Sequence, residues 1–209
     1  FKEIYGFEII EGWGLTEAGA NNSCNPWEGK KKIGSIGLPM KGTEMKIFDH
    51  EDREVPAGES GEIVIRGPQV MKGYWNKPEE TSYSLRNGWL YTGDVGYVDG
   101  DGYFWITDRK KDLIIKGGEN ISPRTIEEVL YMCPGVSEAA VIGVKDEKYG
   151  EEIKAFIVLE AGEKLTADDV INFSKKNLTS FLVPKYVVFL EAMPKSLVGK
   201  ILKTELRKM

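Results

Sequence analysis

The stretch YTGDVGYVDGDGYFWITDRKKDLIIKGGENISP, residues 91–123, decides how this chain is organised. It contains a Gly-Asp-Gly turn signal at 100–102, an unbroken run of charged residues at 108–112, and Gly117–Gly118 shortly before a helix start. Glycines cost backbone entropy on folding, and charged side chains rarely pack into a core. The stretch therefore predicts a functional site that also serves as the junction between two domains.

The residues before this junction predict short strands connected by turns. Residues 43–49 and 61–67 alternate between apolar and polar, and a polar Pro-Gly segment connects them, which predicts a hairpin. Pro78 predicts the first turn of a short helix over 78–85. The expected strands are 7–10, 43–49, 61–67, 88–99 and 102–107. Short strands with regular turns favour a small, distorted β-barrel-like subdomain over residues 1–109.

The residues after the junction mix helices and strands. Ser122 and Pro123 predict the start of a helix that ends at Pro134–Gly135, and Thr166 predicts the cap of a second helix. A short helix is expected within 200–208, and strands are expected at 136–144, 152–160 and 186–191. The pattern predicts a compact α+β domain over 110–209 with a mostly antiparallel sheet. The fold class is therefore α+β.

Composition excludes several classes of partner. The net charge of −5 argues against nucleic acid, and no apolar run approaches the about 18 residues of a membrane span. The net charge is −6 over residues 1–109 and +1 over 110–209, so the second part favours an anionic ligand. Cys24 and Cys133 form no metal-binding spacing, which fits a reducing, cytoplasmic setting. The oligomeric state stays open.

The segment EGWGLTEAG, residues 11–19, is a candidate binding turn. Gly12 and Gly14 flank Trp13, so the backbone can turn sharply beside an aromatic surface. Thr16 and Glu17 place a hydroxyl next to a carboxylate, which suits a phosphate oxygen and a hard cation such as Mg²⁺. The alternative is a Gly-rich turn around a core tryptophan.

Four further groups are candidates, each with a plainer alternative. Asp94 can accept hydrogen bonds from two vicinal ribose hydroxyls, or it can satisfy its own turn. Arg109 lies one hairpin later and can face the same ligand, or it can belong to a solvated loop. Gly117 and Gly118 precede a helix and admit close approach of a ligand, or they form an ordinary turn. Lys200 follows a glycine in a polar loop and can reach an anionic centre, or it is one surface lysine among many.

Taken in order, these motifs resemble the adenylate-forming (AMP-binding) superfamily, in its acyl-CoA synthetase branch. The resemblance covers essentially the whole chain and is carried by GWGLTE, GWLYTGD, GYFWITDRKKDLIIKGGENISP and PKSLVGKILK. It implies a ligase that uses ATP, Mg²⁺ and coenzyme A. A carboxylic acid, expected to be a medium- or long-chain fatty acid, becomes an acyl-adenylate and is then transferred to coenzyme A. A small C-terminal domain rotates between the two steps.

The resemblance also implies roles for the candidate residues. Trp13 matches the position at the adenine, Thr16 the phosphate contact, and Glu17 the metal ligand. Asp94 matches the ribose contact and Arg109 a second nucleotide contact. The residues expected to touch ATP or AMP are Gly12, Trp13, Gly14, Thr16, Asp94, Arg109 and Lys200. The expected catalytic residues are Thr16, Glu17 and Lys200.

For residues 110–209 the resemblance implies a hinge, a mobile domain and a passage for coenzyme A. Lys111 matches the hinge, so that residues 110–209 correspond to the mobile C-terminal lid domain. Residues 1–109 then correspond to the last β subdomain of the large AMP-binding domain. Gly117 and Gly118 match the passage for the coenzyme A arm.

The chain departs from the family's pattern in several places. The family's phosphate loop has no match within 1–209, so the chain is expected to be a C-terminal fragment that is inactive alone. Tyr149 and Leu182 stand where many relatives carry basic residues, which leaves the coenzyme A phosphate contacts open. The acyl chain also stays open. Two alternatives are an adenylation domain that feeds a carrier protein, and a non-catalytic binding module.

Overall fold

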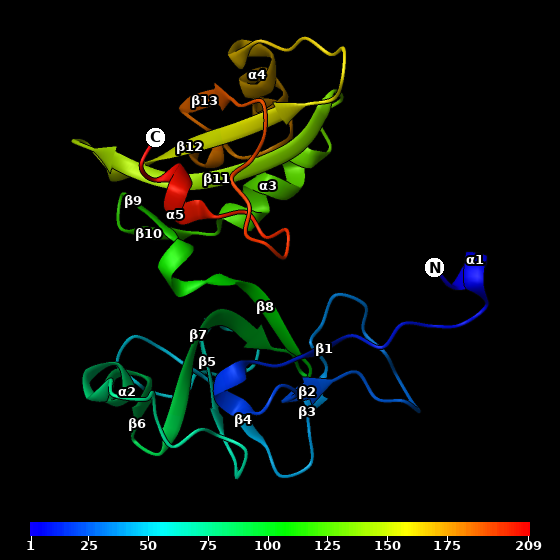
Figure 1. The fold of residues 1–209 in the computed structure, drawn as a ribbon, viewed down its shortest axis with the longest axis vertical. Coiled ribbons are helices and arrows are strands. Elements are labelled where there is room, and N and C mark those ends of the chain that lie inside the picture. Colours follow the sequence, from blue (N-terminus) through cyan, green and yellow to red (C-terminus); the bar gives the residue numbers. More distant parts are fainter. The chain divides into compact units, whose positions relative to one another are not determined.

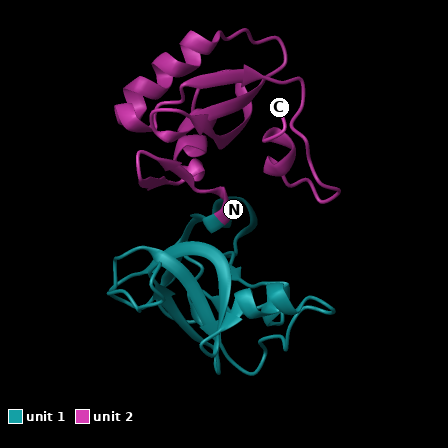
Figure 2. Ribbon diagram, turned by 90° about the vertical axis from the view of Figure 1, so that its left-hand side faces the viewer, with its two compact units in different colours: residues 1–110 teal, residues 111–209 magenta.

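The computed structural model describes all residues, 1–209. The chain divides into two compact units, Phe1–Lys110 and Lys111–Met209, which are coloured separately in Figure 2. The division falls within the charged run at 108–112. Each unit has its own sheet and its own hydrophobic core, and each is described by itself.

Unit 1 contains a curled five-stranded sheet and a small three-stranded sheet. The large sheet has the order β4–β5–β7–β6, with β8 also paired to β7. Its strands are β4 (Glu44–Phe48), β5 (Gly61–Arg66), β6 (Leu85–Arg86), β7 (Trp89–Val98) and β8 (Phe104–Arg109). The small sheet comprises β1 (Gly12–Trp13), β2 (Ser23–Cys24) and β3 (Leu38–Pro39), and the helices are α1 (Lys2–Tyr5) and α2 (Pro78–Ser84).

The curl of this sheet follows from strand β7. Its ladders shift register between Glu62 and Val64 on β5 and between Val95 and Gly96 on β7. Such bulges bend a strand and increase its twist, and β7 is visibly bent in Figure 1. Met45, Ile47, Ile63 and Ile65 alternate along β4 and β5 and are buried in one core. The expected β-barrel-like subdomain is confirmed as a curled antiparallel sheet.

One expected strand of unit 1 is wrong. Residues 7–10 form no strand, and Phe7 is 60% exposed and Ile9 59% exposed. An alternating apolar run becomes a strand only where a partner strand supplies backbone hydrogen bonds. Here β2 pairs with Gly12–Trp13 instead, so the strand begins after the predicted segment.

Unit 2 is a five-stranded sheet with helices on both faces. The order is β10–β9–β12–β11, and β13 pairs with β12 in parallel, while the other pairs are antiparallel. The strands are β9 (Ile114–Lys116), β10 (Glu119–Ile121), β11 (Val136–Asp146), β12 (Gly150–Leu159) and β13 (Tyr186–Phe189). The helices are α3 (Pro123–Tyr131), α4 (Ala167–Asn177) and α5 (Lys203–Leu206). The expected mostly antiparallel α+β domain is confirmed.

The core of unit 2 explains the continuous apolar run in β11. Val141 packs in the cluster that contains Ile126 and Leu130 of α3 and Val170 of α4. Its neighbours Ala140 and Ile142 face the opposite cluster with Leu206 of α5. A strand covered on both faces has no solvated side, so it reads as uninterrupted apolar sequence. None of the helices contains an apolar stretch of the length that a membrane-spanning helix requires.

Asp146, at the end of β11, should make unit 2 sensitive to acid. Its carboxylate accepts hydrogen bonds from Lys185 Nζ at 2.7 Å and from the Lys148 and Tyr149 amides. Lys185 and these amides lower the pKa of Asp146 from 3.8 to about 2. The folded pKa is depressed, so the stabilisation is present above the unfolded value and is lost as pH falls toward about 2. Melting temperatures between pH 5 and pH 2 should therefore fall less steeply in Asp146→Asn than in wild type.

Glu147→Gln is the matched control, because Glu147 is exposed and neighbours Asp146. We expect it to follow the wild-type acid profile. Identical profiles for Asp146→Asn and Glu147→Gln would show that Asp146 does not supply this pH dependence.

Candidate functional site

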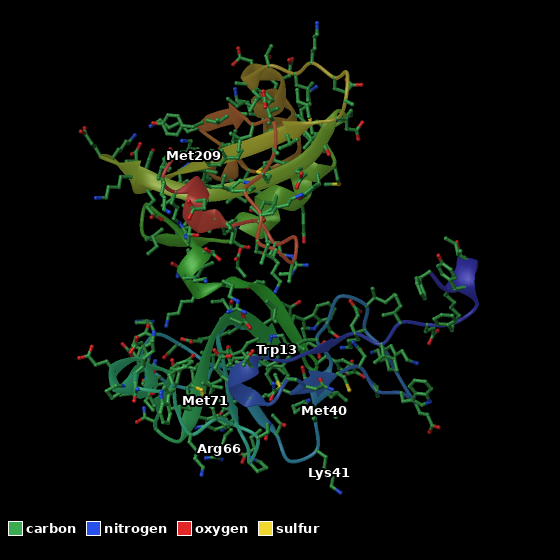
Figure 3. All side chains as sticks on the ribbon, in the orientation of Figure 1. Trp13, Met40, Lys41, Arg66, Met71 and Met209 are labelled. Carbon is green, nitrogen blue, oxygen red and sulfur yellow. The ribbon has the colours of Figure 1, made fainter.

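Asp94 lies at the centre of a polar cluster in unit 1. It stands on β7 directly opposite Arg109 on β8, and Arg109 Nε is 2.5 Å from Asp94 Oδ1. The indole Nε1 of Trp13 donates to Asp94 Oδ2 at 3.0 Å; Trp13 is labelled in Figure 3. The structure thus brings together three predicted site residues that are up to 96 positions apart in sequence.

Burial dominates the electrostatics of this cluster. Asp94 is 3% exposed, whereas the Arg109 side chain is 53% exposed. Burial raises the pKa of Asp94, although the Arg109 guanidinium and the Trp13 indole oppose that shift. Each carboxylate oxygen has two acceptor sites. The two protein donors therefore leave acceptor capacity for a pair of hydroxyls.

Thr16 and Glu17 lie on a short 3₁₀ turn, Thr16–Ala18, three residues beyond Trp13. Thr16 is exposed, and Glu17 Oε1 accepts a hydrogen bond from the Tyr74 hydroxyl at 2.9 Å. Burial, and secondly Glu17, raise the pKa of Tyr74, so its phenol stays a neutral donor. This bond orients the Glu17 carboxylate and leaves its second oxygen free for a cation.

The glycines of the 11–19 segment are needed for close backbone approach. A Cβ at Gly14 would lie 1.2 Å from the Ala20 carbonyl oxygen, and one at Gly12 would lie 3.0 Å from the Ser23 carbonyl oxygen. No side chain fits at Gly14 unless residues 20–21 move. The tight loop that carries Trp13 and Thr16 therefore depends on Gly14.

Gly14→Ala should distort this loop and lower the free energy of unfolding by about 1–3 kcal/mol, as overpacked sites do. Thermal or urea unfolding of the 209-residue chain measures the loss. Gly100→Ala is the matched control, because nothing lies within 4 Å of its Cβ position and its φ is not positive. Equal stability of the two variants would contradict the steric argument.

Lys111 stands between residues that are anchored on either side. Lys110 Nζ pairs with Glu62 at 2.7 Å within unit 1, next to the Arg109–Asp94 pair. Within unit 2, Arg207 pairs with Asp112 at 2.8 Å and donates to the Lys111 carbonyl at 3.2 Å. The Lys111 side chain is exposed and has no hydrogen bond or ion pair. Lys111 is therefore the freest side chain in the charged run.

Gly117 and Gly118 form the tight turn between β9 and β10. Both have positive φ, 58° and 87°, a region that favours glycine. The Gly117 amide donates to the Tyr149 carbonyl at 2.8 Å, whereas nothing lies within 4 Å of the Cβ position of Gly118. One side of the turn is thus held, and the other is open to a ligand.

Lys200 lies at the end of a closed loop in unit 2. A bridge between Lys195 and Ile201 closes the loop, and the Ser196 amide donates to the Lys200 carbonyl at 2.8 Å. Lys200 is exposed, and its ammonium has no partner in the structure. The backbone is held while the charge is free.

The structure groups the predicted residues by unit. Trp13, Asp94 and Arg109 are in contact, while Thr16 and Glu17 share no hydrogen bond with Asp94. The predicted residues of unit 2 are Lys111, Gly117, Gly118 and Lys200. No group of three or more His, Cys, Asp or Glu side chains could hold a metal ion.

Sequence reasoning missed the residues that support the site. Tyr74 holds Glu17, Glu62 holds Lys110, and Lys116 forms a buried pair with Glu152. Only Lys116 had a readable signal, because strand alternation places it on the same face as the buried Ile114. Each of the others depends on a partner distant in sequence.

Two family models match the chain. The model for the AMP-binding enzyme matches residues 1–75, and the model for the AMP-binding enzyme C-terminal domain matches residues 125–200. The chain belongs to the adenylate-forming, AMP-binding enzyme family. The first match lies within unit 1 and the second lies within unit 2.

Curated relatives and solved structures agree with this membership. The chain is 48% identical over 207 residues to a long-chain-fatty-acid–CoA ligase of Bacillus subtilis, covering 99% of this chain and 37% of that protein. It is 45% identical to a feruloyl-CoA synthase of Amycolatopsis, covering 97% of this chain and 42% of that protein. ATP-bound MatB of Rhodopseudomonas palustris matches with a TM-score of 0.90 and 36% identity, over 97% of this chain and 41% of that one. The chain therefore spans less than half the length of these relatives.

Proposed function

We propose that this chain is the C-terminal part of an acyl-CoA synthetase that activates a medium- or long-chain fatty acid. ATP and the carboxylic acid give an acyl-adenylate and pyrophosphate, and the thiol of coenzyme A then displaces AMP. The observation that carries the proposal is the Trp13–Asp94–Arg109 cluster, in a chain 48% identical over 99% of its length to a long-chain-fatty-acid–CoA ligase.

The cluster in unit 1 suits the nucleoside part of ATP. The Asp94 carboxylate accepts the two ribose hydroxyls, and the Trp13 ring offers a flat surface to the adenine. Because Asp94 is 3% exposed and already binds both Trp13 and Arg109, at least one of these side chains moves when the ribose binds. In this proposal the adenine lies against the Trp13 ring, so Trp13 changes environment on nucleotide binding and reports that step.

Thr16 and Glu17 suit the phosphates and Mg²⁺. Mg²⁺ is usually held by one or two carboxylates together with substrate phosphates, not by a cage of protein ligands. A single oriented carboxylate, with one oxygen free of Tyr74, fits that arrangement. Bound there with ATP, Mg²⁺ offsets phosphate charge. Thr16 then donates to a phosphate oxygen.

Unit 2 supplies one group for each half-reaction, Lys200 for adenylation and the Gly117–Gly118 turn for thioester formation. In our proposal residues 110–209 are a mobile lid that rotates about Lys111, while residues 1–109 belong to the large domain. Lys200 stabilises charge on the phosphates during adenylation and is then withdrawn. The Gly117–Gly118 turn then lines the path of the coenzyme A thiol. The unpaired ammonium of Lys200 and the open face of Gly118 support these roles.

We further propose that catalysis needs residues beyond these 209. The chain covers 37% of the related Bacillus ligase, and no phosphate loop of the family's type occurs in it. Relatives that act on fatty acids and on ferulate are similar to this chain to nearly the same degree. The choice of acyl group is therefore governed by residues outside it. Cys24 and Cys133 are both free thiols, which favours the cytoplasm.

Calorimetric titration with ATP–Mg²⁺ and with a non-hydrolysable acyl-adenylate analogue tests the proposal. The longer enzyme, by which we mean the acyl-CoA synthetase proposed to contain this chain, should bind both ligands and form thioester from fatty acids, while the 209-residue chain should do neither. Tight binding and turnover by the chain alone would overturn the requirement for further residues. Unchanged turnover of Asp94→Asn and Lys200→Ala in the longer enzyme would favour a binding module. Transfer to a carrier protein instead of coenzyme A would favour the other alternative.

A further inference from the structure

Lys116 is a buried lysine next to the Gly117–Gly118 turn. It is the last residue of β9 and only 5% exposed, whereas its neighbour Ile115 is 55% exposed. Lysine is rarely buried unless its charge is paired. Nothing in the proposed roles of the glycine turn requires a charge at this position, so the burial needs its own explanation.

The Lys116 ammonium is fully engaged by its surroundings. Its Nζ is 2.5 Å from Glu152 Oε1 and donates to the Phe181 carbonyl at 3.0 Å. It also lies 4.9 Å from the Phe181 ring centroid and 5.7 Å from that of Tyr149, distances at which a cation is attracted to an aromatic face. Glu152 is 4% exposed, so neither charge is solvated.

These partners come from three segments around the turn. Glu152 belongs to β12, Phe181 belongs to the 3₁₀ turn Ser180–Leu182, and Tyr149 precedes β12. The Tyr149 carbonyl accepts the Gly117 amide at 2.8 Å, and the Tyr149 and Phe181 rings meet edge to face at 6.4 Å. The Lys116 side chain therefore contacts β12 at Glu152, the Ser180–Leu182 turn at Phe181 and the residue before β12 at Tyr149.

We propose that Lys116 is a positioning residue for thioester formation, because it fixes the Gly117–Gly118 turn against β12 and the Ser180–Leu182 turn. The inference rests on the proposed function, in which that turn lines the coenzyme A path. Lys116 itself touches no reacting atom. The turn is a two-residue hairpin loop whose flanking residue Lys116 pairs with Glu119 on β10 and with Gly150 on β12. The Lys116 side chain and the Gly117–Tyr149 hydrogen bond add the contacts that hold this turn against Glu152 and the Ser180–Leu182 turn.

The test separates positioning from stability. Lys116→Met alone leaves the Glu152 carboxylate buried and unpaired, which destabilises the fold. Lys116→Met/Glu152→Gln removes both charges and keeps an acceptor for the Ile153 amide, which bonds Glu152 Oε1 at 3.0 Å. The double variant should therefore melt at a higher temperature than the single variant. The control is Lys145→Met, which changes an exposed lysine of β11, the strand that pairs with β12.

In the longer enzyme, ATP–pyrophosphate exchange reports adenylation, and the reaction of preformed acyl-adenylate with coenzyme A reports thioester formation. We expect the double variant to keep wild-type exchange and to form thioester at least about 10-fold more slowly, because a misplacement of about 1 Å can cost about 100-fold. Wild-type thioester rates in a folded double variant would overturn the inference. Wild-type enzyme that shows neither reaction would instead overturn the proposed function.

Amide hydrogen exchange in the 209-residue chain tests the same contact without any activity. The Gly117 amide should exchange at least about 10-fold faster in the double variant than in Lys145→Met, because local opening governs exchange. Unchanged Gly117 protection in the double variant would show that Lys116 does not hold the turn.

Discussion

Replacing Lys200 by alanine in the longer enzyme is expected to slow acyl-adenylate formation by about 100- to 1,000-fold, the usual cost of losing one preorganised electrostatic partner. The Lys200 ammonium is unpaired in unit 2, while the loop backbone around it is closed by the Lys195–Ile201 bridge. A held backbone with a free charge suits delivery to an anionic centre. ATP–pyrophosphate exchange with saturating fatty acid measures the effect.

The same variant should leave thioester formation intact. When acyl-adenylate is supplied directly, Lys200→Ala should transfer it to coenzyme A at nearly the wild-type rate, because in our proposal Lys200 acts only on the first step. Lys164→Ala removes another exposed lysine of the same unit and should affect neither step. If Lys200→Ala slowed both half-reactions equally, the division of labour that we propose for unit 2 would be wrong.

Much of the fold was predictable because its determinants are local. Thr166 and Asp169 form the reciprocal hydrogen bonds of a capping box, and the helix begins where Thr166 predicted. Alternation along 43–49 and 61–67 predicted the β4–β5 hairpin, which pairs Met45 with Ile65 and Ile47 with Ile63. In each case the residues that decide the element lie within it or a single turn away.

The site was predictable in residue type but not in its contacts. Asp94 and Arg109 could be paired from the hairpin between them, whereas the bond from Trp13 to Asp94 spans 81 positions. The Tyr74–Glu17 bond spans 57 positions and the Lys110–Glu62 bond spans 48. No periodicity links such residues, because tertiary packing of separate segments brings them together. The wrong prediction of a strand at 7–10 has the same cause. A strand forms only where a partner strand is available, and here β2 pairs with Gly12–Trp13 instead.

In the rotation that we propose between the units, the contacts around Lys111 limit which residues can act as the hinge. Arg109 and Lys110 are tied to Asp94 and Glu62 of unit 1, and Asp112 is tied to Arg207 of unit 2. Glu62 and Asp94 are 9% and 3% exposed, so these anchors are not ordinary surface pairs. Breaking them would remove the cationic partner of each buried carboxylate, and only the Trp13 indole would remain on Asp94 and the Gly93 amide on Glu62. We propose that the rotation occurs at the backbone dihedrals of Lys111, the central residue of the 3₁₀ turn Lys110–Asp112.

Lys111→Pro in the longer enzyme should therefore uncouple the two half-reactions. Proline fixes its own φ near −65° and also restricts the backbone of the residue before it. The anchored neighbours cannot compensate, so the enzyme should be held in one arrangement of its units. One half-reaction should stay close to wild type, and the other should slow by at least about 100-fold, as misplaced reacting groups do. Pyrophosphate exchange and acyl-adenylate consumption by coenzyme A measure the two steps separately.

Lys111→Ala separates backbone freedom from side-chain chemistry. Alanine removes the exposed ammonium but leaves both dihedrals free, so both half-reactions should run near the wild-type rate. Equal loss in Lys111→Ala and Lys111→Pro would mean that the Lys111 charge matters and its rotation does not. If Lys111→Pro ran both steps normally, the anchors at Glu62 and Arg207 would have to open during the cycle. Charge-neutral variants at those two positions would then be the ones that alter the balance between the steps.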